Sequence, residues 1–180
     1  MNKITTETKI NPFILESIQG ELVNIPHDVN FTHLQFRRFS GCPMCNLHIQ
    51  KFIQNSHLLM NNSIQEVVIF HSTKSSMLSH HANAPFPLIA DPEKLIYKTF
   101  GVEKSIMSIL HPRAWVAGIK GLFTQGIGLP DLGESVIGLP ADFLIDKSGK
   151  VVALKYGTHA YDHWELEDVI EFANCASKKP

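Results

Sequence analysis

The chain of 180 residues lacks the features that mark several common classes of protein. It has 16 Lys and Arg against 17 Asp and Glu, a formal net charge of -1, and its three arginines form no basic stripe. Binding to nucleic acid through phosphate contacts is therefore not expected. No apolar run approaches the roughly 18 residues that a membrane span needs. Charged residues interrupt the first twenty positions, so no secretory signal peptide is visible and a cytoplasmic location is expected.

Several motifs built on cysteine or glycine are absent from the sequence, and their absence argues against particular cofactors. The three cysteines are an odd number and do not indicate a disulfide framework. There is one C-x-x-C motif without a second, and no histidine pair with H-x3-5-H spacing in a finger-like position, so a four-ligand zinc site is not expected. The phosphate-binding motifs G-x-x-x-x-G-K-[ST] and G-x-G-x-x-G are absent, which argues against a nucleotide cofactor. The proportions of 44% hydrophobic and 18% charged residues fit a single globular domain over residues 1–180.

The hydrophobic periodicity predicts an α/β domain with a central mixed sheet flanked by helices. Strands are expected at residues 21–25, 33–39, 66–70 and 86–90, and helices at 43–60, 75–81 and 91–101. The last of these helices is predicted to begin with Asp91 as its N-cap and Pro92 at its first position. Two further strands at 141–146 and 151–156 are joined by a Gly-containing loop and predict a closing hairpin. A final helix is expected from Asp162, with Glu165 completing a capping box.

Two segments lie outside this alternation. Residues 1–20 form an N-terminal extension in which the spacing of apolar residues predicts a short amphipathic helix. Residues 102–137 are rich in glycine and proline and are interpreted as an insertion before the closing hairpin, with one helix around Trp115. This insertion is a candidate cover for a functional site or a candidate contact in a homodimer.

The C-x-x-C pair, Cys42 and Cys45, lies at the junction between a predicted strand and a predicted helix. Cys42 falls at the N-cap and Pro43 at the first helical position, where the missing N–H costs nothing. Free N–H groups of the first turn and the helix dipole are expected to favour a Cys42 thiolate. Cys45 lies one turn further on, within reach of a disulfide, and begins the apolar stripe of the helix. One accessible and one sheltered sulfur is the arrangement that thiol–disulfide exchange requires, so a redox pair is predicted.

Two other interpretations compete with a redox pair. Cys42, Cys45 and His48 have spacing that suits three metal ligands, so the domain is alternatively a non-enzymatic module that binds a metal ion or a protein partner at this edge. The cysteines are otherwise small buried apolar residues. The strand–C-x-x-C–helix context favours redox chemistry over both.

At this point the sequence resembles the thioredoxin-like superfamily, and within it the peroxiredoxin-like (AhpC/TSA-type) proteins. The resemblance covers about residues 20–175 and rests on the segments FRRFSGCPMC (36–45), ADPE with Tyr97 and FGV (90–102), GLPADFLID (138–146) and KYGTH (155–159). It implies a thioredoxin-like fold and a thiol-dependent oxidoreductase that needs no cofactor. The implied substrate is a small peroxide or disulfide, and the implied reductant is a dithiol such as thioredoxin or glutathione. The resemblance also implies that Pro140 is a cis-proline that lies against the cysteine pair and contacts substrate.

The family pattern leaves the attacking cysteine open. Peroxiredoxins place a proline seven positions and a hydroxyl residue three positions before the peroxidatic cysteine. Counting back from Cys42 gives Gln35 and Phe39, whereas counting back from Cys45 gives Arg38 and Cys42. In the first register Cys42 attacks and Cys45 resolves, which the position at the helix start favours. In the second register Cys45 is the peroxidatic candidate and Cys42 replaces the hydroxyl residue.

The remaining polar candidates have simpler expectations. Arg37 and Arg38 are neighbours on a strand and point to opposite faces, so at most one of them can assist a thiolate, and the other is expected to be solvated. Arg113 is expected to be surface charge. Cys175 is expected to be incidental, near a fraying terminus.

Overall fold

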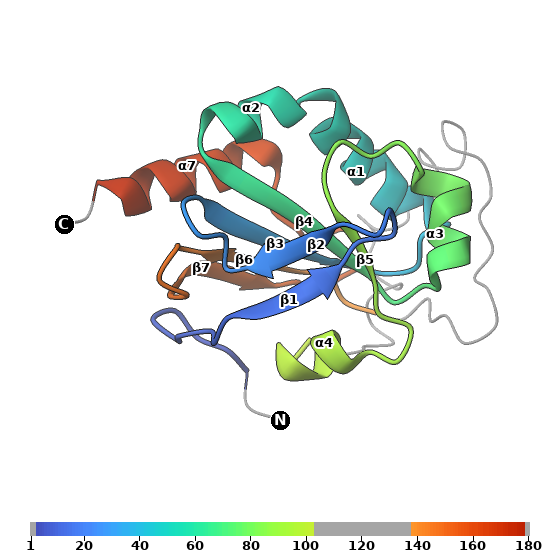
Figure 1. Cartoon of the computed structure of the whole chain (residues 1–180), viewed down its shortest axis with the longest axis horizontal. Helices are drawn as coiled ribbons and strands as arrows, with labels where there is room; N and C mark the ends of the chain where they lie inside the picture. Colours follow the sequence, from blue (N-terminus) through green and yellow to red (C-terminus); the bar gives the residue numbers. More distant parts are fainter. Residues whose placement is uncertain (1–2, 103–137, 179–180) are drawn as a thin grey trace.

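A computed structural model describes residues 3–102 and 138–178 of the chain (Figure 1). Its main sheet has five strands in the order β5-β4-β3-β6-β7. The strands are β3 (Phe31–Arg37), β4 (Ile64–Phe70), β5 (Leu88–Ala90), β6 (Ala141–Ile145) and β7 (Val151–Tyr156). β3, β4 and β5 are parallel, whereas β6 pairs antiparallel with both β3 and β7. The predicted mixed sheet with an antiparallel closing hairpin is therefore confirmed.

Helices and a small hairpin cover the two faces of this sheet. One face packs against α1 (Pro43–Gln54), α2 (Ser56–Asn61), α3 (Lys74–His81) and α7 (Leu166–Ser177), with Ile49, Phe52, Leu59, Met77 and Val169 in its core. The other face packs against α4 (Leu95–Thr99) and the antiparallel pair of β1 (Phe13–Glu16) and β2 (Leu22–Ile25). Within the described residues, no helix is long and apolar enough to cross a bilayer.

The N-terminal segment is extended, so the short helix predicted there is wrong. Residues 7–10 run beside β7, where the Ile10 amide donates to the Gly149 carbonyl at 2.7 Å. Phe13 and Leu15 then pack inward against the second core, while Ile14 between them is 61% exposed. Because inward and outward positions alternate, the period is that of a strand. Gly149 lies so close to this segment that a Cβ there would stand 2.4 Å from the Ile10 carbonyl oxygen.

Three predicted helix boundaries are also corrected. The helix expected over 43–60 divides at Asn55, whose side-chain amide donates to the Lys51 carbonyl and ends α1. Asp91 and Pro92 precede α4 as a turn, and α4 begins at Leu95 after Lys94, which has a left-handed φ of 57°. The last helix begins later than predicted: the N-cap of α7 is Glu165, and its capping box is formed with Asp168.

Candidate active site

The cysteine pair lies where β3 passes into α1, at the carboxyl end of the parallel strands. Cys42 has the extended backbone of an N-cap residue, with φ -66° and ψ 115°, and Pro43 is the first residue of the helix. Cys45 follows in the first turn. The predicted position of Cys42 and Pro43 at the helix start is therefore confirmed.

Both sulfurs are buried, which contradicts the expectation of one accessible and one sheltered thiol. Cys42 is 1% exposed and Cys45 is 4% exposed. The loop before Cys42 is drawn inward because Ser40 is fixed to the segment after β4: its amide donates to Ser72 Oγ at 2.8 Å, and its hydroxyl pairs with that of Ser76 at 3.0 Å. The loop therefore holds both cysteines in the interior.

Arg38 provides the positive charge next to the pair. Its guanidinium donates to the Cys42 Sγ at 2.8 Å, and its backbone N–H faces the Cys45 sulfur closely enough to favour a thiolate there. The expected capping contact is replaced by this arginine, since the Cys42 side chain accepts no capping hydrogen bond from the helix. The Cys45 amide also lies near the Cys42 sulfur, and its effect is to lower the pKa of Cys42, which favours the thiolate. Of the two strand arginines, Arg38 is thus the one at the cysteines.

The two thiols titrate as a pair that shares one proton. The hydrogen bond from the Cys42 thiol lowers the pKa of Cys45 to about 5, against the effect of burial and with the help of Arg38. Burial, together with the hydrogen bond and charge of Cys45, raises the pKa of Cys42 well above its usual range, although Arg38 opposes this. The pair therefore favours one thiolate and one thiol beside Arg38, and burial with the Cys45 charge raises the pKa of Cys42, where the helix start predicts a lower one.

Arg37 is buried rather than solvated, which corrects the expectation for the second arginine. It is 1% exposed, and its guanidinium donates to Asp142 Oδ1 at 2.7 Å and to the Phe36 carbonyl at 3.0 Å. Arg37 is the last residue of β3, whereas Arg38 lies just beyond the strand and contacts the cysteines. Asp142 on β6, 105 positions along the chain, pairs with the Arg37 charge and so allows this charge to be buried.

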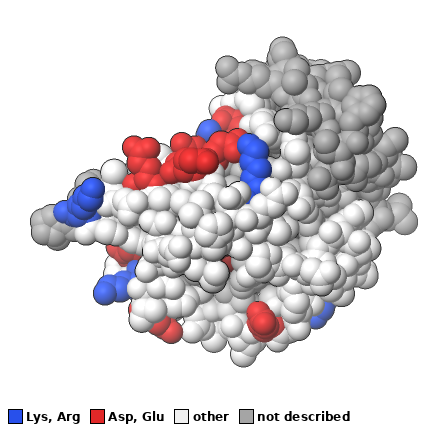
Figure 2. Space-filling model, turned by 90° about the horizontal axis from the view of Figure 1, so that it is seen from above, with Lys and Arg blue, Asp and Glu red and all other residues white. Residues whose placement is uncertain are grey.

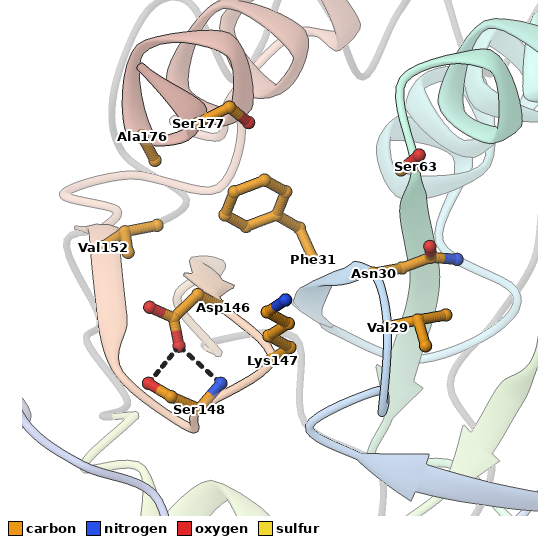
Figure 3. Close-up of a pocket in the computed structure, with 10 residues that line it drawn as sticks. All are labelled: Val29, Asn30, Phe31, Ser63, Asp146, Lys147, Ser148, Val152, Ala176 and Ser177. Atoms are coloured by element: carbon orange, nitrogen blue, oxygen red, sulfur yellow. Dashed lines mark hydrogen bonds between the residues drawn. The ribbon is translucent and has the colours of Figure 1, made fainter. Parts of the chain in front are cut away.

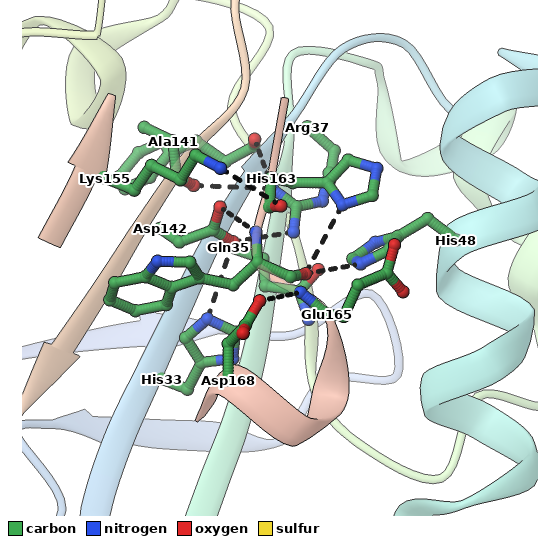
Figure 4. A network of polar contacts seen from close by, with 12 residues as sticks. His33, Gln35, Arg37, His48, Ala141, Asp142, Lys155, His163, Glu165 and Asp168 are labelled. Atoms are coloured by element: carbon green, nitrogen blue, oxygen red, sulfur yellow. Dashed lines mark hydrogen bonds and ion pairs between the residues drawn. The ribbon is translucent and has the colours of Figure 1, made fainter. Parts of the chain in front are cut away.

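Arg37 belongs to a buried network of charges beneath α1 and the segment before α7 (Figure 4). His33 Nδ1 lies 2.8 Å from Glu66 Oε2, and His33 Nε2 lies 3.5 Å from Asp142 Oδ1. Burial alone would lower the pKa of His33, but Glu66 and Asp142 outweigh it and raise this pKa to about 9. The pKa of Asp142 is lowered, because Arg37 and His33 outweigh its burial. Two cations thus face two carboxylates.

His48 contacts this network rather than a metal site. Its Nε2 lies 2.9 Å from the Trp164 carbonyl oxygen, and its ring centroid lies 3.6 Å from that of His163. Burial, with the nearby charges of His163 and Arg37, keeps the pKa of His48 well below its ordinary value. Among residues 3–102 and 138–178, no three His, Cys, Asp or Glu side chains are grouped to hold a metal ion. Cys42, Cys45 and His48 are therefore not brought together as the ligand trio that their spacing suggests.

The segment before β6 lies against Arg38, although Pro140 is not a cis-proline. Gly138 is so close to Arg38 and His71 that a Cβ on it would stand 3.4 Å from Arg38 Cγ and 3.6 Å from His71 Nε2. Among the described residues, the cis peptide bond is Ile25–Pro26, so the expected cis bond at Pro140 is wrong. The Pro140 carbonyl accepts from the Gly157 amide at 2.9 Å. This bond continues the β6–β7 ladder and keeps the backbone extended.

Tyr97 is the residue at this site to which sequence reasoning assigned no role. Its hydroxyl donates to the carbonyl of Arg37 and lies 2.8 Å from the carbonyl oxygen of Ile69. The tyrosine was noted only as part of a family-like segment, and it lies 60 positions from Arg37 in the chain. No local pattern signals such a contact. Arg113 and the helix expected around Trp115 lie outside the described residues.

The described cavities lie away from the cysteines. A pocket of about 450 Å³ at the opposite end of β3 is lined by Phe31, Asp146, Lys147 and Ser177, among others (Figure 3). A second cavity, of about 430 Å³, is lined by Phe172 and by Cys175, whose thiol is exposed. Neither cavity includes Cys42 or Cys45 in its lining.

Acidic side chains gather in one region of the face that Figure 2 shows. Figure 2, seen from above, shows Asp and Glu side chains gathered on a face that is otherwise mostly uncharged. Glu167 and Asp168 lie in the first turn of α7, and Glu165 pairs with Lys51 at 2.8 Å. Negative charge at this end stabilises the helix through its dipole.

A sequence profile described as AhpC/TSA antioxidant enzyme matches residues 51–159 of the chain. The chain belongs to the AhpC/TSA family. The resemblance drawn from its sequence segments is thereby confirmed. The matched region begins after Cys42 and Cys45, so membership in the family does not itself assign roles to the cysteines.

Solved structures give the same thioredoxin-like fold. Peroxidoxin BcpB from Mycobacterium tuberculosis has a TM-score of 0.69 at 16% identity, covering 94% of this chain and 96% of that one. A cysteine variant of PrxQ from Xylella fastidiosa has a TM-score of 0.69 at 14% identity, covering 99% and 100%. A thiol:disulfide interchange protein, DsbE from Chlorobium tepidum, has a TM-score of 0.61 at 18% identity, covering 97% and 99%. Among curated protein sequences, no significant match is found. These likenesses confirm the predicted fold class.

Proposed function

We propose that this AhpC/TSA-family chain is a thiol-dependent oxidoreductase of peroxiredoxin type, with Cys42 and Cys45 as its redox pair. One observation carries the proposal: two buried cysteines at the first turn of α1 lie beside the buried Arg38, whose guanidinium donates to the Cys42 Sγ at 2.8 Å. A thiolate is the reactive form of cysteine, and a neighbouring arginine favours it. A thiol within hydrogen-bonding distance of that thiolate is placed to resolve the product.

The proposed first step is attack by Cys45 on a hydroperoxide. The Cys45 thiolate attacks one oxygen of the O–O bond, which breaks, and the leaving alkoxide or hydroxide takes up a proton to give an alcohol or water. Cys45 is oxidised to a sulfenic acid. This order corresponds to the register in which Cys42 replaces the hydroxyl residue of the peroxiredoxin pattern. It differs from the order that the helix start alone favours, because the shared proton supports charge on Cys45 rather than Cys42.

The proposed second step forms the disulfide. The Cys42 sulfur, having lost its proton, attacks the Cys45 sulfenic sulfur, and the S–O bond breaks to release water after protonation of the leaving hydroxide. An external dithiol, thioredoxin or a glutathione system, then supplies two electrons and two protons by thiol–disulfide exchange. No step requires a metal, flavin or nucleotide. Attack on a small disulfide in place of a peroxide uses the same pair.

Pro140 remains a proposed substrate contact in this scheme. The support is positional: Gly138, two residues before it, lies against Arg38, which contacts the cysteines. The cytoplasmic location and a homodimer through the insertion stay predictions from the sequence.

The test is mass spectrometry with peptide mapping after one equivalent of hydrogen peroxide. A rapid loss of two hydrogens that maps to a Cys42–Cys45 disulfide is expected. Cys42→Ser should stop at a Cys45 sulfenic acid that dimedone traps, and Cys45→Ser should form none. Cys175→Ser is the matched control, because its thiol is exposed and lies at a separate cavity, and it should behave as the unaltered protein. If both thiols of the pair stay reduced under peroxide and under a small disulfide, the proposed function is wrong.

A further inference from the structure

The peptide group between Arg37 and Arg38 connects a buried tyrosine to the sulfur pair. Its N–H, which belongs to Arg38, faces the Cys45 sulfur. Its carbonyl, which belongs to Arg37, accepts a hydrogen bond from the Tyr97 hydroxyl. One planar unit is thus held by the tyrosine at one end and presents a donor to the sulfur at the other.

Tyr97 is itself held firmly in place. The Asp91 carboxylate accepts from three successive amides at the start of α4, including the Tyr97 amide at 3.2 Å. The ring packs edge-on against Phe36, with centroids 5.1 Å apart, and against His71, with centroids 5.9 Å apart. A side chain that is 7% exposed and fixed from several sides keeps the direction of its hydroxyl.

The electrostatics link the same groups in the reverse direction. Burial, then the charge of Asp91, then that of Cys45, raise the pKa of Tyr97 well above its ordinary value. The phenol therefore stays protonated and remains a donor while Cys45 carries its charge. A hydrogen bond to a peptide carbonyl polarises the group and strengthens the N–H of the same unit as a donor.

We propose that Tyr97 is a positioning residue for the Cys45 thiolate, acting through the Arg37–Arg38 peptide group. The inference rests on the proposed function, because it concerns the sulfur that is assigned the first attack. Removing the hydroxyl leaves the Arg37 carbonyl without this donor and the peptide free to turn away from the sulfur. The thiolate then loses part of its stabilisation.

The experiment isolates Cys45 in the Cys42→Ser, Cys175→Ser protein, in which it is the sole cysteine of the three. Its pKa is taken from the pH dependence of the rate of alkylation by iodoacetamide. Tyr97→Phe, which keeps the ring, is expected to raise this pKa by about 0.5 unit, equivalent to about threefold less thiolate where the thiol is mostly protonated. The matched control is Tyr156→Phe, whose hydroxyl donates to the Phe100 carbonyl at 2.6 Å, and it should leave the pKa unchanged.

A general loosening of the site is distinguished by the complementary protein, in which Cys42 is the sole cysteine. Its sulfur accepts from the Arg38 guanidinium, and the backbone donor that favours its thiolate belongs to Cys45, so Tyr97→Phe should shift its pKa much less. Equal shifts of the two thiols, or no shift of Cys45, overturn the inference.

A second substitution keeps the inference testable if Tyr97→Phe fails to fold. Incorporation of 3-fluorotyrosine at position 97 keeps the hydroxyl and makes it a stronger donor, so the Cys45 pKa should fall, and an unchanged value overturns the inference. Different results would refute the two proposals. Absence of a Cys42–Cys45 disulfide under both peroxide and a small disulfide refutes the proposed function, whereas an unmoved Cys45 pKa refutes only the role of Tyr97.

Discussion

The charge on His33 makes the stability of the fold depend on pH in the alkaline range. In the folded protein the pKa of His33 is about 9, because Glu66 and Asp142 outweigh the effect of burial. In the unfolded chain an ordinary value of about 6.5 applies. Between these values the folded protein keeps a proton that the unfolded chain has lost. The stabilisation is therefore complete below pH 6.5 and is lost as the pH rises through 9.

The magnitude follows from the difference between the two pKa values. About 2.5 units at about 1.36 kcal/mol per unit give about 3 kcal/mol. No discount for solvent screening applies, since His33 is fully buried. This amount is about a fifth to three fifths of the 5–15 kcal/mol that is typical of a single domain.

The assay is urea unfolding at pH values from 6 to 10, comparing the parent protein with His33→Gln. Both proteins carry serine in place of all three cysteines, which removes the thiols that titrate in the same range. His33→Gln leaves Glu66 and Asp142 without the imidazolium, so its deficit in unfolding free energy should be largest at pH 6. The deficit should shrink by about 3 kcal/mol by pH 10. A deficit that does not change with pH refutes a charged His33, and an imidazole that loses its proton near pH 6.5 by NMR refutes it directly.

Two further predictions concern the arginine at the cysteines and the histidine pair. Arg38→Met removes a charged donor to sulfur worth about 1.5–3 kcal/mol, so the lower thiol pKa should rise by about 1–2 units, while Arg38→Lys should restore part of it. Iodoacetamide rates against pH measure this, and an unmoved pKa contradicts the assigned role. Burial and then the positive charge of Arg37 lower the pKa of His163 to about 3. Burial also lowers the pKa of His48. For these groups the unfolded chain binds the extra proton, so stability falls as the pH drops below 6.5, by about 2 kcal/mol at pH 5 for His163. His163→Gln should flatten this acid limb in urea unfolding, and a stability that rises on acidification excludes the explanation.

The sequence predicts the parts of the fold that local patterns control. Continuous apolar runs mark the buried strands, and the proline after Cys42 marks the start of α1. The N-terminal segment was assigned wrongly because residues spaced like a helix face also suit a strand when Phe13 and Leu15 find a core to cover. That core is made by residues far along the chain, which a local period does not contain.

The candidate site divides in the same way. The position of the cysteines at the start of a helix follows from the C-x-x-C motif and Pro43. The burial of Arg37 does not, because its partner Asp142 comes from β6. The charge state of the two sulfurs also depends on three-dimensional contacts. Ser40, in the loop before Cys42, is hydrogen-bonded to Ser72 and Ser76, and these bonds hold the loop and the cysteines in the interior. Sequence identifies the chemistry-bearing residues here, whereas tertiary contacts decide their charge states.

The distribution of buried charge explains why the reduced pair holds a single proton. In the network beside β3, the positive charges of Arg37 and His33 balance the negative charges of Asp142 and Glu66. The network is therefore neutral overall and supplies no excess positive charge to the cysteines. At the start of α1, Arg38 brings one positive charge to the two sulfurs. A second negative charge there would be buried without a matching cation, which is costly. One thiolate and one thiol is the state that matches Arg38. Because a disulfide carries no charge, oxidation removes this match, and the arginine that activates the thiolate also favours the reduced form of the pair.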